Sequence, residues 1–202
     1  FYFADRREWA EAGLCCFAAA LTRVTGAALF LPMAVMFAGN RPRGQGGARG
    51  LWLLLGPLGV VLFLFYVQAG LGSWTVYFQA QGQWDKAVAP PWVGMGWELV
   101  GGAWRVDRVL NVASFALFAG LAAAVWRRLG PGWGLYMVIG VLVPAFSSRW
   151  IGMPRYMMML VPGFVLLGAW LRNRWVFAAY IACSAALMLY CFRAFLNWRM
   201  SF

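Results

Sequence analysis

The most regular feature of the sequence is a series of long apolar runs separated by short clusters of arginine, glycine and proline. Several of the runs approach the ~20 residues that an α-helix needs to cross the hydrocarbon core of a bilayer. They do not show the strict alternation of a membrane β-barrel. We therefore predict an all-α, polytopic transmembrane helix bundle with about 6–7 membrane segments. The runs fall at about residues 9–38, 51–71, 108–126, 133–146, 156–171 and 174–196.

The composition agrees with a membrane location. Hydrophobic residues make up 63% of the chain and charged residues only 11%, which excludes a soluble domain of this size. The net charge of +11 would suggest nucleic acid in a soluble protein. Here most arginines lie in short loops between apolar runs, where they orient the chain and meet anionic headgroups. We predict one integral membrane domain over residues 1–202, with the lipid bilayer as a partner and no nucleic acid.

The first apolar run carries Arg23 near its middle and permits two interpretations. It is either one long kinked span or a hairpin of two short helices that breaks at Thr25-Gly26. The hairpin is favoured because it brings four arginine-rich loops to one side, and the positive-inside rule makes that side cytoplasmic. Arg23 and the loops 72–107 and 147–155 then face the opposite side, with 72–107 as a long external loop.

The residue types limit the possible chemistry. The chain has no histidine, which excludes His-ligated zinc, a Ser-His-Asp triad and a Cys-His pair within it. We expect neither a metal nor a cofactor. The four cysteines lie in apolar runs without Cys-x-x-Cys spacing, so we interpret them as small packing residues. They are Cys15, Cys16, Cys183 and Cys191.

A general base on the external side must therefore be a carboxylate. Asp85, Glu98 and Asp107 are the candidates there. Each also permits a simpler interpretation, since Asp85 can pair with Lys86, and Asp107 with a neighbouring arginine, on a solvated surface.

The stretch SSRWIGMPRYMMMLVPGF, residues 147–164, places Arg149 and Arg155 on the side where the positive-inside rule disfavours them. Pro154 suits the first turn of a helix, so we expect Arg155 and Tyr156 at a helix N-terminus at the membrane surface. There they can bind a lipid phosphate. The alternative is that the arginines snorkel to ordinary headgroups.

The segment 72–107 is rich in tryptophan, with indoles at Trp74, Trp84, Trp92, Trp97 and Trp104. One interpretation is an aromatic belt at the membrane interface. The other is a platform on which indole faces stack against sugar rings, while nearby polar side chains hydrogen-bond the hydroxyls. Those side chains are Gln79, Gln81 and Asp85.

Three stretches, AALTRVTGAALFLP, FQAQGQWDKAVAPPW and MPRYMMMLVPGF, resemble in order and approximate spacing the PIG-V-like mannosyltransferases of the GT-C superfamily. Members of that superfamily are multispanning, metal-independent, inverting glycosyltransferases with a polyprenyl-phosphate sugar donor on the lumenal or periplasmic face. The resemblance implies a GT-C-like fold. It also implies transfer of a sugar from that donor to a lipid-linked or protein acceptor. The location would be a bacterial plasma membrane, or the endoplasmic reticulum membrane in a eukaryote.

The resemblance also implies roles for individual residues. Donor-phosphate contacts fall on Arg155 and Tyr156, in a PRY element with Pro154, and on Arg23, in a TR-x-x-G element with Thr22 and Gly26. Arg149 is a further candidate for the donor phosphate because it lies in the same external loop as Arg155. Sugar or acceptor contacts fall on Gln79, Gln81, Trp84 and Trp92.

The family's catalytic acid lies in a first external loop, and nothing in this chain matches it. We expect it to precede residue 1, with this chain as the C-terminal part of a longer protein. Asp85 is the candidate that the chain offers in its place, but it does not lie in a first loop. A lipid-binding or transporter-type protein and a structural membrane subunit are the alternatives.

Overall fold

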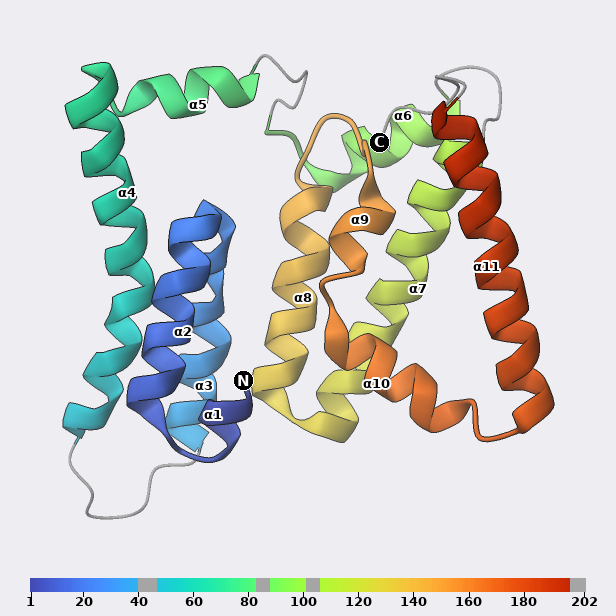
Figure 1. Ribbon diagram of the computed structural model, residues 1–202, viewed down its shortest axis with the longest axis horizontal. Coiled ribbons are helices and arrows are strands. Elements are labelled where there is room, and N and C mark those ends of the chain that lie inside the picture. Colours follow the sequence, from blue (N-terminus) through green and yellow to red (C-terminus); the bar gives the residue numbers. More distant parts are fainter. Residues whose placement is uncertain (40–46, 83–87, 101–105, 197–202) are drawn as a thin grey trace. The chain divides into compact units, whose positions relative to one another are not determined.

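The structure, a computed structural model, describes residues 1–39, 47–82, 88–100 and 106–196 (Figure 1). Within these residues every regular element is a helix, and the only strand-like pairing is an isolated bridge between Val88 and Ser147. The predicted all-α class is confirmed. The chain divides into two compact units, Phe1–Lys86 with Trp126–Ile139 and Ala87–Val125 with Gly140–Phe202.

The elements follow one another along the chain with short connections. The first unit holds α1 (Tyr2–Asp5), α2 (Trp9–Thr22), η1 (Val24–Leu29), α3 (Phe30–Gly39), η2 (Gly47–Leu54), α4 (Leu55–Leu71) and α5 (Thr75–Gly82). The helices α7 (Val106–Leu129) and α8 (Pro131–Ala145) contribute to both units. The second unit also holds α6 (Pro91–Val100), α9 (Met153–Met157), α10 (Val161–Trp170) and α11 (Arg174–Leu196).

The first apolar run is a hairpin, as predicted. Helix α2 ends at Thr22, and Arg23 is extended with φ −150° and ψ 132°. The chain then folds back, so that Gly26 lies against the backbone of Ala19 and Ala20 with no room for a Cβ atom. The turn begins at Arg23, slightly before the predicted break, and glycine is required at position 26 because the two backbones approach so closely.

After α3, the chain returns beside α2 in the same direction. Gly13 lies against Trp52 of η2, and Gly59 of α4 lies against Ala20. The early residues of α2 thus pair with η2 and the late residues with α4, so the two run parallel. Small residues at such contacts let helix backbones pack closely where apolar burial from water contributes little.

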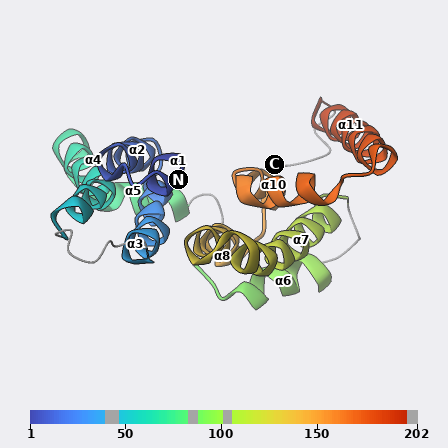
Figure 2. The same cartoon turned by 90° about the horizontal axis from the view of Figure 1, so that it is seen from below.

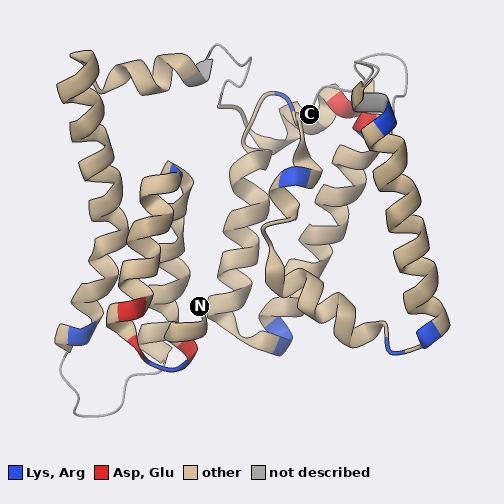
Figure 3. Cartoon of the chain, in the orientation of Figure 1, with Lys and Arg blue, Asp and Glu red and all other residues tan. Residues whose placement is uncertain are grey.

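The charges of the first unit follow this arrangement. Arg6 and Arg7 precede α2 and Arg49 lies in η2, which places all three at one end of the parallel pair. Arg23 lies at the other end, after α2 (Figure 3). These four arginines therefore separate as the hairpin interpretation predicts.

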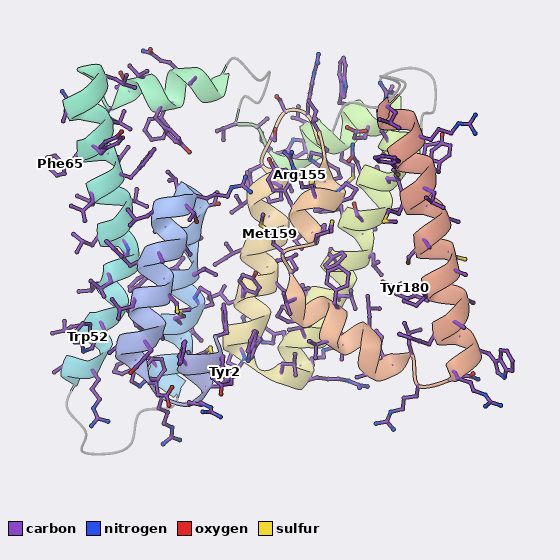
Figure 4. The ribbon with its side chains drawn as sticks, in the orientation of Figure 1. Tyr2, Trp52, Phe65, Arg155, Met159 and Tyr180 are labelled. Carbon is purple, nitrogen blue, oxygen red and sulfur yellow. The ribbon has the colours of Figure 1, made fainter. Side chains whose placement is uncertain are left out.

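Among the described residues, three helical stretches are long and apolar enough to cross a membrane: Gly47–Leu71, Val106–Leu129 and Arg174–Arg193. Of their most apolar windows only 22%, 28% and 0% is buried within the protein. The side chains of Trp52 and Phe65 accordingly point away from the neighbouring helices (Figure 4), and α11 lies apart from α7 and α10 (Figures 1 and 2). Apolar surface on this scale requires an apolar solvent, which a bilayer provides.

The run 156–171 does not form one helix, contrary to its uninterrupted apolar character. Helix α9 ends at Met157, residues 158–160 connect, and α10 starts at Val161 with Pro162 in its first turn. A continuous helix would put the Pro162 ring against the carbonyl of Met158 and lose one backbone hydrogen bond, which explains the break.

The segment 72–107, predicted as a loop between spans, contains helices α5 and α6. It begins at Gly72, whose φ of 74° ends α4 in the left-handed conformation that glycine favours. The Gln68 amide donates to the Gly72 carbonyl (2.9 Å) and accepts from the Trp74 N–H (3.0 Å). The exit from α4 is thereby held in one geometry.

The cysteines differ in their surroundings. Cys16 is buried in the core of the first unit, as a packing residue should be. Cys15 and Cys183 are exposed and Cys191 is half-buried, so for the two exposed residues the packing interpretation was wrong. An apolar run does not reveal which of its faces meets protein and which meets lipid.

Candidate functional site

Arg149 and Arg155 lie in a segment that also carries buried apolar side chains. Residues 147–157, here called the arginine segment, connect α8 to α10 and include α9. Trp150, Met153 and Met157 are each 1% exposed, whereas Arg149 is half-buried and Arg155 is exposed. The segment is thus anchored by apolar side chains, while the side chain of Arg155 stays exposed (Figure 4).

The anchoring depends on a sharp turn. Gly152 has φ 72°, a value that favours glycine, and lies between the buried Trp150 and Met153. The Trp150 indole donates a hydrogen bond to the Ala145 carbonyl (3.1 Å) and packs on the Phe115 ring of α7, 4.5 Å between centroids. Trp150 therefore ties the segment to α8 and α7 together.

Helix α6 receives the arginine segment on one face. Gly94, Trp97 and Glu98 are three and four residues apart, so they share that face. The Trp150 indole and the Ser147 carbonyl fill the space that a Cβ on Gly94 would need. One turn later, the Arg149 guanidinium carbon lies 4.7 Å from the centre of the Trp97 ring, a cation–π contact.

Glu98 and Asn111 are the buried polar side chains of the described residues, at 5% and 7% exposure. The Asn111 Oδ1 accepts a hydrogen bond from the Met153 N–H at 3.1 Å. The Glu98 carboxylate accepts hydrogen bonds from the Asn111 side chain and from the Trp150 backbone N–H. Side chains from α6 and α7 thus reach the backbone of the arginine segment at two points.

Burial raises the pKa of Glu98 above its ordinary value of 4.5. The nearby charge of Asp107 also raises the pKa, while the hydrogen bonds from Asn111 and Trp150 and the charge of Arg108 lower it. One carboxylate oxygen, Oε2, is buried without a hydrogen-bond partner. Desolvation therefore dominates, and Glu98 holds a proton at higher pH than a surface glutamate.

Arg155 is exposed, so its guanidinium is accessible to a ligand. Its guanidinium carbon lies 5.5 Å from the ring centre of Tyr156, so the two predicted donor contacts are neighbours in space. The predicted helix N-terminus is present, with Pro154 in the first turn, but α9 has only 5 residues. The dipole of so short a helix contributes little to anion binding. Any phosphate contact depends on the guanidinium itself.

The other predicted residues lie elsewhere. Trp92 is in α6 of the second unit and is 72% exposed. Arg23 and Gln79 are exposed in the first unit, where Gln81 lies near the end of α5. Trp84, Trp104 and Asp85 fall outside the described residues. The structure thus groups Arg149, Arg155 and Tyr156 in one segment of the second unit.

The sequence presents Glu98 only as one of three external carboxylates, and it gives no role to Asn111. The signal for Asn111 was available, because it is an amide near the start of a long apolar helix, and polar side chains within such helices usually have a specific partner.

Comparisons with protein-family models, curated proteins and solved structures find no match to this chain.

Proposed function

We propose that the protein is a membrane glycosyltransferase of the mannosyltransferase type. It would take a sugar from a polyprenyl-phosphate donor and transfer it to a lipid-linked or protein acceptor on the external or lumenal face. The observation that carries the proposal is a difference in exposure within the arginine segment. Arg155 is exposed, whereas the apolar side chains that hold the segment in place are buried. An arginine that only met disordered headgroups would need no such fixed support.

The membrane arrangement belongs to the proposal. Besides the three long spans, four shorter apolar helical stretches are present, Trp9–Thr22, Val24–Gly39, Pro131–Ala145 and Val161–Trp170. If these also insert, the total is about six or seven membrane segments, some of them tilted or reaching only part of the depth. The membrane would be a bacterial plasma membrane, or that of the endoplasmic reticulum in a eukaryotic source.

The reaction would proceed by displacement at the anomeric carbon. The acceptor hydroxyl forms the new glycosidic bond, and the bond from the anomeric carbon to the phosphate oxygen breaks. The electron pair leaves with the lipid phosphate, which Arg155, Tyr156 and Arg149 would stabilise as its charge grows. The hydroxyl proton passes to a carboxylate that acts as general base, for which Asp85 is the candidate within this sequence.

The test is a transfer assay with the full-length protein in lipid vesicles. Labelled polyprenyl-phosphate mannose is supplied as donor, and labelled product is measured for lipid and peptide acceptors. Transfer from this donor, but not from a nucleotide sugar, supports the proposal. Binding of the donor without any transfer would instead favour the alternative, a non-enzymatic lipid-binding or transporter-type protein.

A further inference from the structure

We propose that Glu98 and Asn111 form a polar clamp that sets the position of the arginine segment, so that both are positioning residues for Arg149 and Arg155. As far as it concerns donor binding, the inference rests on the proposed function. The clamp itself is a statement about the fold and can be tested separately.

The first step is the placement of the two hydrogen bonds. The side-chain oxygen of Asn111 in α7 accepts a hydrogen bond from the Met153 N–H, with 3.1 Å between nitrogen and oxygen. Glu98 of α6 accepts a hydrogen bond from the Trp150 N–H. These two amides bracket Gly152, whose left-handed conformation makes the turn. Fixing both sides of one turn determines its orientation, whereas a single contact would leave it free to rotate.

The second step is that the two side chains are coupled. The Asn111 oxygen is engaged with Met153, so its amide nitrogen is the group that donates to Glu98. Glu98 and Asn111 therefore orient each other as well as the backbone. Both are at least nine-tenths buried, where a hydrogen bond is stronger and a missing partner is more costly than at the surface.

The third step links the clamp to the charged groups. Trp97 is adjacent to Glu98 and carries the Arg149 guanidinium on its ring. On the other side, Met153 is two residues before Arg155 in the short helix α9. A shift of the turn would move both arginines together, and guanidinium contacts with phosphate depend strongly on geometry.

Buried apolar contacts alone would not give the same result. Trp150, Met153 and Met157 hold the segment against α6 and α7, but apolar contacts are non-directional and allow sliding. Hydrogen bonds prefer a narrow range of distance and angle. The apolar residues therefore hold the segment against α6 and α7, and the hydrogen bonds of Glu98 and Asn111 determine its exact position.

The fold can be tested by residue-resolved hydrogen exchange on the full-length protein in phosphatidylcholine nanodiscs. We expect Asn111→Ala to speed exchange of the Met153 amide, and Glu98→Ala that of the Trp150 amide, by about tenfold or more, a factor that corresponds to ~1.4 kcal/mol. Glu98→Gln retains an acceptor oxygen and should preserve most of the protection. Ser114→Ala is the matched control, because Ser114 lies one turn along α7 and bonds only its own helix, to the carbonyls of Leu110 and Asn111.

Donor binding is measured in the same nanodiscs with a polyprenyl monophosphate as probe. We expect its dissociation constant to rise about tenfold in Asn111→Ala and Glu98→Ala, and to stay within twofold of wild type in Ser114→Ala and Glu98→Gln. If the alanine variants do not fold, Asn111→Leu replaces Asn111→Ala: the side chain keeps its volume but neither accepts from Met153 nor donates to Glu98, so faster exchange is expected at both the Met153 and Trp150 amides.

The outcomes separate the two proposals. Unchanged exchange at Met153 and Trp150 in folded variants would overturn the clamp, as would Glu98→Gln exchanging like Glu98→Ala. Faster exchange with unchanged probe affinity would overturn its positioning role. If the wild-type protein does not bind the probe but the exchange results hold, the clamp stands and the proposed function fails.

Discussion

The backbone N–H of Met153 donates a hydrogen bond of 3.1 Å to the side-chain oxygen of Asn111, a residue 42 positions earlier in the chain. This bond joins the start of α9 to the first turns of the long helix α7. The arginine segment, whose regular structure is limited to the short helix α9, is thereby fixed to the long helix α7. Because the backbone of the segment is fixed, its arginine side chains start from fixed positions. A site for a single phosphate group needs side chains that are positioned in this way.

The contact between α6 and Trp150 should be sensitive to one methyl group. Gly94→Ala would place its Cβ in the space held by the Trp150 indole and the Ser147 carbonyl, so the side chain or the turn must shift. We expect a loss of stability of about 1–3 kcal/mol, as is usual for overpacking. The measurement is the free energy of unfolding of the detergent-solubilised protein.

Gly96→Ala is the control for this prediction, because nothing lies within 4 Å of its added Cβ. It sits in the same helix and should be neutral or slightly stabilising, since alanine favours a helix more than glycine does. Equal losses in the two variants would argue against the close packing of α6 on the arginine segment.

Glu98 should make stability depend on pH in a defined direction. Its pKa in the folded protein is raised above 4.5, mainly by burial, with Asp107 adding to the rise and Arg108 opposing it. Between the unfolded and folded pKa values the native state binds more protons, so stability falls as pH rises through this window. The contribution of Glu98 is fully present below the unfolded pKa and is lost above the folded one.

Glu98→Gln tests this prediction, because the amide keeps the shape and one acceptor but does not titrate. We expect the free energy of unfolding of the variant, relative to wild type, to be higher at pH 8 than at pH 5. Measurement needs unfolding curves of both proteins at each pH. Parallel dependences would mean that Glu98 is not desolvated in the folded state.

The hairpin of the first unit makes a prediction about sidedness. Thr25 is exposed just beyond the turn at Arg23, and Ala48 is exposed at the start of η2 near the opposite end of the unit. On a cysteine-free background, Thr25→Cys should react with an impermeant thiol reagent from outside, and Ala48→Cys only from the cytoplasm. Labelling of both positions from one side would contradict the hairpin topology in the membrane.

Much of the helical arrangement could be predicted from hydrophobic runs and from breakers. The stretches Val106–Leu129 and Arg174–Leu196 agree closely with their apolar runs, because arginines or a Gly-Pro pair bound them. The hairpin followed from placing Arg23 and the arginine-rich loops on opposite sides. The break before Pro162 does not follow from apolar length, because it depends on the effect of proline on a helix interior.

The site was less accessible to sequence reasoning. Arg149 and Arg155 stood out as charges on the wrong side of the membrane, a local property of the sequence. The roles of Glu98 and Asn111 depend on tertiary contacts with Trp150 and Met153, and a single sequence contains no record of which distant backbone amide a side chain will meet. Glu98 therefore looked like any carboxylate of a polar segment.

The most direct test of the central claim concerns Arg155 and the donor phosphate. A guanidinium offers two donors in a fixed fork, whereas lysine offers a point charge, so Arg155→Lys should retain only part of the activity. Arg155→Ala should lose about 10²-fold or more, in kcat more than in KM, because the contact strengthens as the phosphate departs. Arg172→Ala, an exposed arginine between α10 and α11, is the control and should behave like wild type.

The measurement is turnover of polyprenyl-phosphate mannose by these variants of the full-length protein in vesicles, normalised to folded protein. A large loss in Arg155→Ala, a partial loss in Arg155→Lys and normal turnover in Arg172→Ala are the results that we expect. Wild-type turnover in Arg155→Ala would contradict the claim that this arginine holds the donor's phosphate.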